Sequence, residues 1–248
     1  NSKFVLPAQL DRFPSGGCLR VLDVCFGLGY NTAALMAALP NAGGPSLECW
    51  GLELDRSPLR LALAEPRFID LWPKHVVAAL GAVATDGYWQ DSLRQHSVQM
   101  LWGDARQQLQ NLPKELQLDL ILLDAFSPGK CPQLWSEEFL QSLASLLAPG
   151  GRLLTYCRAA AVRNSLRHAG LELRSLLPKA GEKSGWSSGT LALCSKDRDQ
   201  TPPETGPGWC GLSVMEEEHL QTRAGVPYRD PSGTDLAAAM LKRSQREE

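Results

Sequence analysis

Short apolar runs alternate with longer segments of helical periodicity along most of this chain, which limits the folds open to it. Strands separated by helices pair in parallel, with helices against both faces of the sheet. The last two apolar runs have no helical segment between them, so we expect them to pair antiparallel. The predicted strands are residues 19–24, 47–54, 98–103, 118–124, 151–157, 171–177 and 190–195. The sequence therefore predicts an α/β fold with a mostly parallel, seven-stranded sheet, helices on both faces and an antiparallel last strand.

Two segments depart from the alternation. Residues 66–97 separate the second and third predicted strands and are too long for a simple connection, so we expect an insertion there. The stretch after the last strand is rich in Pro and Gly, and the spacing of Ser213 and Glu216 then indicates a helix capping box. We predict one domain over residues 1–196 and a linker with a helical C-terminal extension over residues 197–248.

The amino-acid composition limits which binding partners and which cellular compartment we expect for this protein. Lys plus Arg number 25 and Asp plus Glu number 27, so a nucleic-acid or membrane contact would have to rest on a local patch. Seven cysteines without a C-x-x-C pair fit reduced thiols better than a disulfide framework or a zinc site. The sequence has neither a signal peptide nor an apolar run near the ~18 residues of a membrane-spanning helix. We expect a soluble cytoplasmic protein that binds no metal and no membrane.

The turn after the first strand, in the stretch LDVCFGLGYNT, carries Gly27 and Gly29. Glycines let the backbone pass close to a ligand, and ligands of open parallel sheets bind beyond the carboxyl ends of the strands. The dinucleotide pattern G-x-G-x-x-G would need a glycine where Thr32 stands. A buried acid at Asp23 also suits a cationic amino-acid group better than a pyrophosphate. The pattern therefore favours a binder of S-adenosyl-L-methionine (SAM), with a plain tight turn as the alternative.

Acids also end the second and third predicted strands. Glu53 lies about 20 residues beyond the glycines, the distance at which an acid binds ribose hydroxyls, although a solvated strand-end acid is the alternative. Asp104 is placed to accept from an adenine amino group with Ala105 beside the ring; a helix N-cap is the alternative, and one carboxylate could serve both roles. Three acids at three successive strand ends are less expected by chance than any one of them.

The fourth predicted strand ends in LLDAFSPGKCPQLW, which places Asp124 near the reactive centre of a bound SAM. Methyl transfer is an in-line displacement that needs a positioned, unprotonated nucleophile, and a carboxylate can orient an amine and receive its proton. We predict Asp124 as the catalytic residue, with a turn cap as the alternative. Phe126 and Trp135 offer stacking surfaces on the loop, and core packing is the alternative for Trp135.

Three stretches of the sequence resemble one family. DVCFGLGYNT, LWGDARQQL and residues 122–173, which begin LLDAFSPGKCPQLW, resemble the methyltransferase domain of MnmC-type tRNA-modification enzymes. The resemblance runs over residues 19–195, and the D-A-F-S-P…P-x-x-W loop is its most specific part. It implies a Rossmann-like, SAM-dependent fold that methylates the aminomethyl group of 5-aminomethyl-2-thiouridine at the tRNA wobble position.

The resemblance also implies site residues. Asp124 would face the aminomethyl nitrogen. The predicted SAM contacts are Asp23, Phe26, Gly27, Gly29, Asn31, Glu53, Asp104, Ala105 and Asp124. The predicted substrate contacts are Phe126, Lys130, Trp135 and Lys183, the last being the nearest candidate for a Lys-Arg pair of the family.

Two departures from the family pattern matter. The bifunctional members carry a flavin-dependent oxidase domain, whereas this sequence has no second glycine fingerprint, so we expect a stand-alone methyltransferase whose aminomethyl substrate is made elsewhere. Family members also have an upstream segment with Glu, Tyr, His and Gly that encloses the methionine end of SAM. This sequence begins after that segment, so we expect part of the site to lie outside it.

A tRNA partner, bound through its anticodon region, requires a local basic face. Most of the candidate cations lie in the last third of the sequence, and solvated helix charges are the alternative. They are Lys130, Arg158, Arg163, Arg167, Arg174, Lys179 and Lys183, with Phe126, Trp135 and Trp186 as aromatics that could stack an unpaired base.

Two other functions stay open at this point. One is a SAM-dependent methyl- or aminopropyltransferase that acts on a small amine, although such substrates need several acids and this loop offers Asp124 with Lys130 close by. The other is a SAM- or tRNA-binding module without catalysis. The oligomeric state and the tRNA species are left open.

Overall fold

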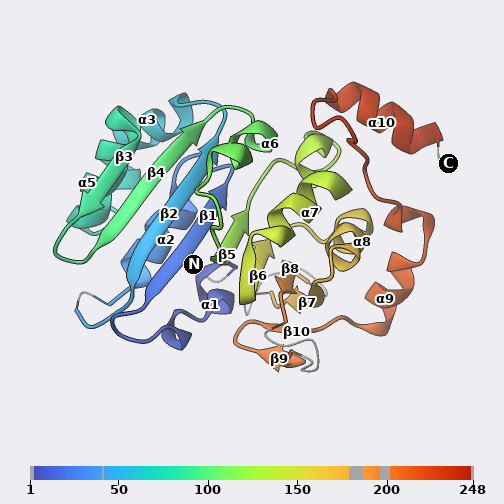
Figure 1. The fold of residues 1–248 in the computed structure, drawn as a ribbon, viewed down its shortest axis with the longest axis horizontal. Helices are drawn as coiled ribbons and strands as arrows, with labels where there is room; N and C mark the ends of the chain where they lie inside the picture. Colours follow the sequence, from blue (N-terminus) through green and yellow to red (C-terminus); the bar gives the residue numbers. More distant parts are fainter. Residues whose placement is uncertain (1–2, 41, 179–186, 196–201, 247–248) are drawn as a thin grey trace.

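The computed structural model describes residues 3–40, 42–178, 187–195 and 202–246. The described strands form one sheet in the order β3-β4-β2-β1-β5-β6-β8-β7-β10-β9 (Figure 1). Its central strands are β4 (His96–Trp102), β2 (Ser46–Glu53), β1 (Cys18–Val24), β5 (Leu118–Leu123), β6 (Leu147–Thr155), β8 (Gly189–Leu193) and β7 (Glu172–Leu176).

The strand directions confirm the predicted fold class. β4, β2, β1, β5 and β6 pair in parallel, and β8 pairs antiparallel with both β6 and β7. The predicted antiparallel pairing of the last two strands is therefore correct. The predicted count of seven was too low, because β3 (Tyr88–Asp91), β9 (Thr205–Gly206) and β10 (Trp209–Gly211) extend the sheet at its edges. These strands have two to four residues, too few to show a period of two.

Helices cover the sheet in two groups (Figure 1). α2 (Tyr30–Ala38), α3 (Ser57–Ala64) and α5 (Lys74–Asp86) enclose one core with β1, β2 and β4. α6 (Ala105–Gln108), α7 (Glu137–Ser145) and α8 (Ala160–His168) enclose a second core on the opposite face. The other helices are α1 (Val5–Ala8), α4 (Pro66–Ile69), α9 (Val214–Leu220) and α10 (Ala237–Arg246), with 3₁₀ turns at 10–12, 109–111, 132–135 and 223–225.

Strand β1 lies between β2 and β5 and is covered by helices on both faces of the sheet. Its last four residues, 21–24, are all buried, as in parallel sheets that are covered on both faces. Val21 belongs to the core beneath α2 and α5, whereas Leu22 and Val24 belong to the core beneath α7 and α8. This central position brings the carboxyl end of β1 to the middle of one sheet edge.

The C-terminal residues pack against the rest of the chain. β10 pairs with β7 at the sheet edge, and the backbone of Tyr228 receives a hydrogen bond from the Glu137 N–H at 2.9 Å. Arg106 pairs with Asp230 at 2.6 Å. The division of the chain at residue 196 stays a prediction. None of the helices in the described ranges is long and apolar enough to cross a membrane.

Candidate active site

The carboxyl ends of β1, β2, β4 and β5 meet at one edge of the sheet, and hydrogen bonds join the residues that follow them. The Gly27 N–H donates to the Glu53 carboxylate at 2.8 Å. The Asn31 amide donates to the Asp124 carboxylate at 3.1 Å. The structure thus brings together the turn and two of the strand-end acids that the sequence singled out.

The two glycines of the turn serve different purposes. Both have positive φ, +56° at Gly27 and +80° at Gly29, which favours glycine. A Cβ atom at Gly27 would have its nearest described neighbour at 3.6 Å, so the backbone there stays open to a ligand. At Gly29 it would meet Phe26, Leu80 and Leu59 at 3.0–3.2 Å. Gly29 therefore allows close packing of the turn on α3 and α5.

The side chain of Phe26 belongs to that packing. It is 3% exposed and lies in the core beneath α2 and α5. The prediction of a SAM contact is therefore not supported for its side chain. From the sequence alone, an aromatic residue beside a glycine turn could either contact a ligand or pack in the core. The fold shows that Phe26 packs in the core.

Asp23 is fully buried at the end of β1. Its Oδ2 accepts a hydrogen bond from the Thr32 hydroxyl at 2.7 Å, while Oδ1 has no hydrogen-bond partner among the described residues. Burial raises the pKa of Asp23 to about 7. A buried acceptor without a partner is uncommon, but a side chain with no exposed surface presents no face to a ligand in this conformation.

We expect Asp23 to make the stability of the ligand-free protein depend on pH. The pKa of its carboxyl lies at 3.8 ordinarily and at about 7 in the fold, so the folded protein keeps a proton that the unfolded chain releases. The contribution of Asp23 to the free energy of unfolding therefore falls as the pH rises from about 4 to 7. Urea unfolding should show that the wild type loses stability relative to Asp23→Asn as the pH rises across that range, because the asparagine amide is neutral at every pH. Parallel profiles would contradict this expectation.

Glu53 is fixed by the backbone around it. Besides Gly27, the N–H groups of Leu54 and Asp55 donate to its carboxylate at 2.7 and 3.1 Å. An ionised carboxylate has about four lone-pair positions, so three donors leave room for a ribose hydroxyl. Its predicted role at the cofactor thus fits its surroundings.

Asp104 is the N-cap of α6. Its side chain accepts from the Arg106 N–H at 3.0 Å and pairs with the Arg106 guanidinium at 2.6 Å. Hydrogen bonds from Arg106 hold the pKa of Asp104 below its ordinary value. The helix-cap alternative is therefore correct, and an adenine contact would have to share the carboxylate with Arg106. Ala105 is 7% exposed and packs in the second core.

Two aromatic side chains hold the loop that carries Asp124. The Trp135 indole N–H donates to the Phe126 carbonyl at 2.7 Å, and the Tyr156 hydroxyl donates to the Ala125 carbonyl at 2.8 Å. The two rings pack edge to face at 6.1 Å. Burial raises the pKa of Tyr156 to about 12, which keeps its hydroxyl protonated as a donor.

The substrate contacts predicted on this loop have different outcomes. Trp135 is fully buried, so its ring offers no stacking face, and the core-packing alternative is correct. Phe126 is 77% exposed and stays available for stacking. Asp124 and Lys130 are exposed, and Lys183 lies outside the described residues. Tyr156 was not singled out from the sequence, although a tyrosine at the end of a predicted strand was the available signal.

The structure contradicts the predicted basic face for tRNA at three of its arginines, which are held by partners within the protein. Arg163 is 2% exposed and pairs with Glu216 at 2.8 Å. Arg167 binds Glu217 through two hydrogen bonds, and Arg174 is 5% exposed and donates to backbone carbonyls. These arginines are held by intramolecular partners because α8 and β7 lie beneath C-terminal residues.

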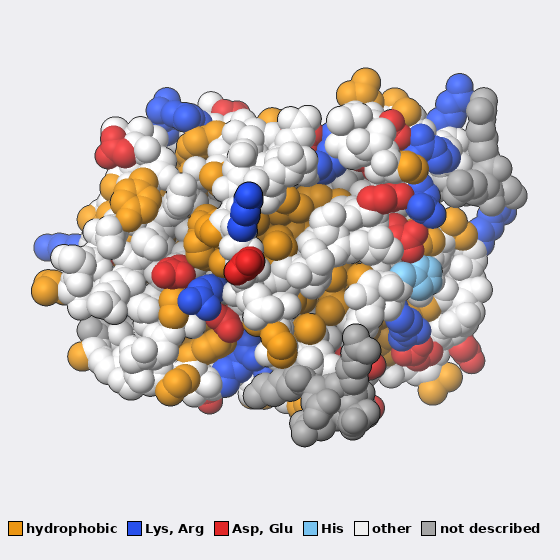
Figure 2. Space-filling view, in the orientation of Figure 1, with side chains coloured by type: hydrophobic (Ala, Val, Ile, Leu, Met, Phe, Trp, Pro, Cys, Tyr) orange, Lys and Arg blue, Asp and Glu red, His pale blue; other side chains and the backbone are white. Residues whose placement is uncertain are grey.

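The other residues predicted for the tRNA-binding face have different outcomes. Lys179, Lys183 and Trp186 lie outside the described residues. Arg158 is exposed and donates to the Ser187 carbonyl at 3.1 Å. On the face drawn in Figure 2, Lys and Arg side chains lie interspersed with Asp and Glu side chains.

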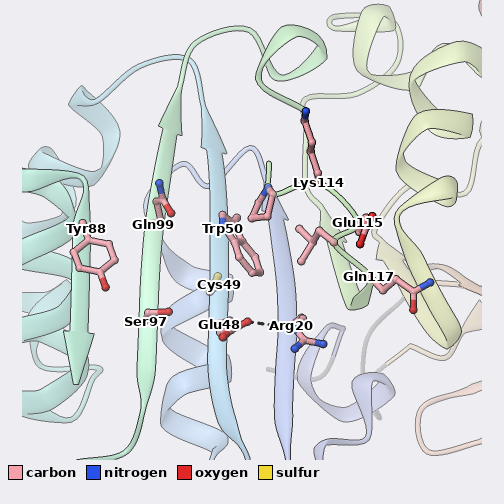
Figure 3. Close-up of a pocket in the computed structure, with 12 residues that line it drawn as sticks. Arg20, Glu48, Cys49, Trp50, Tyr88, Ser97, Gln99, Lys114, Glu115 and Gln117 are labelled. Atoms are coloured by element: carbon pink, nitrogen blue, oxygen red, sulfur yellow. Dashed lines mark hydrogen bonds and ion pairs between the residues drawn. The ribbon is translucent and has the colours of Figure 1, made fainter. Parts of the chain in front are cut away.

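A cavity of about 580 Å³ lies on the open face of the sheet and not at the strand ends. Figure 3 shows its lining, with Trp50 on β2, Tyr88 on β3 and Lys114 on the loop before β5. Arg20 and Glu48 form an ion pair across it at 3.3 Å. Within the described ranges, no group of three or more His, Cys, Asp or Glu side chains could hold a metal ion.

Comparison with known proteins agrees with the predicted resemblance. A family model described as an S-adenosyl-L-methionine-dependent methyltransferase matches residues 71–192. The bifunctional tRNA 5-methylaminomethyl-2-thiouridine biosynthesis protein MnmC of Chromohalobacter salexigens is 28% identical over 236 residues, which cover 88% of this chain and 30% of that protein. The protein of the same name from Pseudomonas entomophila is 32% identical over 179 residues, or 67% of this chain and 26% of that protein. The chain thus spans less than a third of the length of these two relatives.

Solved structures support the same fold. MnmC2 from Aquifex aeolicus aligns over 98% of this chain and 72% of its own, with a TM-score of 0.74 and 25% identity. A probable spermidine synthase from Corynebacterium glutamicum aligns over 94% of this chain and 79% of its own, with a TM-score of 0.53 and 15% identity, and shows the fold alone. The predicted MnmC-type resemblance is confirmed, and the family and fold imply SAM as the cofactor.

Proposed function

We propose that this SAM-dependent methyltransferase methylates the aminomethyl group of 5-aminomethyl-2-thiouridine at the tRNA wobble position, giving 5-methylaminomethyl-2-thiouridine. The observation that carries the proposal is the link from the glycine turn through Asn31 to the exposed Asp124 carboxylate, which puts a cofactor-type turn and an amine acceptor side by side. The names of the MnmC relatives give the product of the pathway.

The cofactor site is proposed on two features of the described residues. The backbone of Gly27 is open on its ligand side, and Glu53 is fixed with acceptor capacity left. These suit the backbone approach and the ribose hydroxyls of SAM. Bound there, SAM would supply a methyl group on a cationic sulfur.

The proposed chemistry needs positioning more than covalent participation. The bond from the substrate nitrogen to the methyl carbon would form while the bond from that carbon to sulfur breaks, with its electron pair staying on sulfur, and the proton that the nitrogen loses would pass to the Asp124 carboxylate. Asp124 would hold the amine by a hydrogen bond, aim its lone pair and stabilise the positive charge that develops on nitrogen. Asn31 orients the carboxylate through its amide N–H. Trp135 and Tyr156 fix the loop behind it.

Glu53→Gln is expected to weaken SAM binding by about tenfold or more. The change keeps one carbonyl acceptor and removes the charge that strengthens hydrogen bonds from ribose hydroxyls, an effect of about 1.5–3 kcal/mol. Glu48→Gln is the matched control, because Glu48 lies on the same strand but on the open sheet face. Calorimetry that finds equal SAM affinity in Glu53→Gln and the wild type would remove Glu53 from the site. Tight NAD binding without SAM binding would overturn the cofactor class.

The function is tested by transfer of tritium from methyl-labelled SAM to tRNA from a strain that lacks this methylation step, followed by nucleoside analysis. We expect label in 5-methylaminomethyl-2-thiouridine. Equal activity on the free nucleoside would favour the small-amine alternative, and SAM binding without transfer would favour a non-catalytic module. With tRNA as its substrate and the anticodon region as its contact, the protein would act in the cytoplasm on an aminomethyl group made by another enzyme.

A further inference from the structure

Arg106 connects the proposed cofactor site with the C-terminal part of the chain. Its side chain is 11% exposed, and each of its three guanidinium nitrogens donates a hydrogen bond. Nε and Nη2 hold the Asp104 carboxylate at 3.1 and 2.6 Å. Nη1 donates to the Asp230 carboxylate at 2.6 Å and to the Asp235 carbonyl at 3.0 Å. One guanidinium therefore joins an acid at a strand end to two residues that precede α10.

Asp104 lies close to Glu53, the proposed ribose acceptor. The N–H of Gly103, the residue before Asp104, donates to the Glu53 carbonyl at 2.9 Å, since β4 runs parallel to β2 up to this point. The side chain of Asp104 is 32% exposed, although Arg106 beside it is nearly covered. The carboxylate of Asp104 thus keeps an accessible side at the sheet edge where the cofactor site is proposed.

The contacts with Arg106 use most of the acceptor positions of Asp104. A carboxylate has about four lone-pair positions. The backbone N–H and the Nε of Arg106 bind Oδ1, and Nη2 binds Oδ2, so the described hydrogen bonds leave about one position, on Oδ2. Hydrogen bonds from Arg106 also hold the pKa of Asp104 below its ordinary value, so the group is ionised at neutral pH and can only accept. A single fixed acceptor suits one amino group of a ligand.

Asp230 holds Arg106 from the other side. Its side chain is 1% exposed, and its Oδ1 accepts from the Asp235 N–H at 3.1 Å. The backbone N–H of Asp230 donates to the Glu138 carboxylate on α7 at 2.7 Å. Residues 230–233 belong to the stretch between α9 and α10 in Figure 1, and they line a cavity of about 220 Å³ together with Arg106 and residues of α7. This stretch therefore fixes Arg106 against α7, and through Arg106 it fixes the Asp104 carboxylate.

We propose that Arg106 is a positioning residue for cofactor recognition, which fixes the Asp104 carboxylate so that its remaining acceptor position selects a purine with a 6-amino group. The proposal rests on the proposed function, because it takes the cofactor site at the strand ends as given. It also gives the C-terminal residues, through Asp230, a part in the choice of cofactor. A fixed, ionised carboxylate discriminates because a purine without the amino group leaves it unpaired, and the carboxylate cannot turn to another donor.

The test measures how strongly the full chain prefers adenine to unsubstituted purine in the same ligand. The probes are S-adenosylhomocysteine, which SAM becomes after methyl transfer, and its analogue that lacks only the 6-amino group. Their dissociation constants are measured by calorimetry. We expect the wild type to bind the adenine compound about 10- to 100-fold more tightly, the scale for a hydrogen bond to a charged group. Any loss of folded protein affects both constants equally, so the ratio reports the contact and not the stability.

Arg106→Lys should lower this preference by about fivefold or more. Lysine keeps the charge but lacks the planar fork that holds both carboxylate oxygens, so the Asp104 side chain becomes free to turn. Arg20→Lys is the matched control, because Arg20 pairs with Glu48 at the open-face cavity of Figure 3. It should keep the preference within about twofold of the wild type.

Asp230→Asn tests the contact with the C-terminal residues. Asparagine keeps a carbonyl acceptor for Nη1 but removes the charge that strengthens the hydrogen bond, so we expect a smaller loss of preference, about threefold. Asp235→Asn makes the same change in the same stretch, at a side chain that pairs with Arg243 and not with Arg106. It should keep the preference of the wild type. An equal loss in both variants would overturn the role assigned to Asp230.

The other outcomes separate the role of Arg106 from the proposed function. A wild type that binds the two probes equally would overturn the proposal, since Asp104 would then accept nothing from adenine. An unchanged preference in Arg106→Lys would overturn it too. An increased preference would do the same, because Arg106 would then compete with adenine for the carboxylate. If the expected preferences are found but no methyl group is transferred to tRNA, the role of Arg106 stands and the proposed function fails.

Discussion

Asp124→Asn is expected to lower the turnover of methyl transfer by about 100-fold and to leave SAM affinity nearly unchanged, the usual scale for a positioned acid or base. The substrate nitrogen is an alkyl amine with a pKa of about 10, so at neutral pH most of it is protonated and has no free lone pair. A carboxylate attracts the ammonium form as well, so its benefit comes from orienting the amine and from stabilising the charge that develops during transfer.

The surroundings of Asp124 make the asparagine variant a clean test. Asn31 donates to Oδ2, and the carbonyl of an asparagine can accept the same hydrogen bond, so the shape of the loop should persist. The loop is also held independently through Trp135 and Tyr156. Single-turnover rates from pH 6 to 9 separate chemistry from binding. The matched control is Asp119→Asn, because Asp119 lies near the opposite end of β5 and accepts from the backbone of Arg20.

Two outcomes bear on the assignment. A rate near that of the wild type across the whole pH range would mean that Asp124 is only a turn cap, and the catalytic assignment would be wrong. An equal loss in Asp119→Asn would indicate that a general loss of stability, and not the lost carboxylate, slows the reaction.

The strand-end acids were predictable because a parallel sheet brings the ends of its strands to one edge. Once the alternation of strands and helices is read, Glu53 and Asp124 must lie near the glycine turn, and they do. The prediction needs no side-chain detail. The same logic placed Asp104 there, but it could not show that Arg106 would occupy the carboxylate.

Burial of single residues next to the strand ends was not predictable. Phe26 and Trp135 are apolar residues in turns, and their position along the chain is the same whether the ring faces a ligand or the core. The fold decides, since the cores beneath α2 and α7 reach to the ends of the strands and include both rings. Trp135 still supports the loop, through its indole N–H and not through its ring face.

The prediction that the arginines of α8 lie on an exposed basic face was wrong for a different reason. Their partners come from α9, about 50 residues further along the chain, beyond a Pro/Gly-rich stretch that reads as a linker. Local sequence gives no sign that this segment returns to cover α8. The arginines of α8 were therefore predicted to belong to an exposed basic face, although one of them lies inside the protein.

Arg163→Met is expected to destabilise the protein by about 3–5 kcal/mol, the scale for removing one partner of a buried ion pair. The side chains of Arg163 and Glu216 are 3% and 5% exposed, and Arg163 also donates to the hydroxyl of Thr190 at 2.9 Å. The variant would leave the Glu216 carboxylate buried without its cation, and that carboxylate also accepts from the Ser213 N–H at the start of α9. The loss should therefore loosen the attachment of α9 to α8.

Arg167→Met provides the matched control for that variant. Arg167 lies one turn further along α8 and pairs with Glu217, the residue after Glu216, but the two side chains are 38% and 45% exposed. Exposed pairs contribute little, so we expect a change of under about 1 kcal/mol. Urea unfolding of the two variants measures the difference directly. Similar free energies of unfolding would mean that water reaches the Arg163–Glu216 pair, and that α9 is not fixed on α8 through it. A large gap would mean that the buried pair, together with the further hydrogen bonds of Arg163, contributes more to stability than the exposed pair on the next turn.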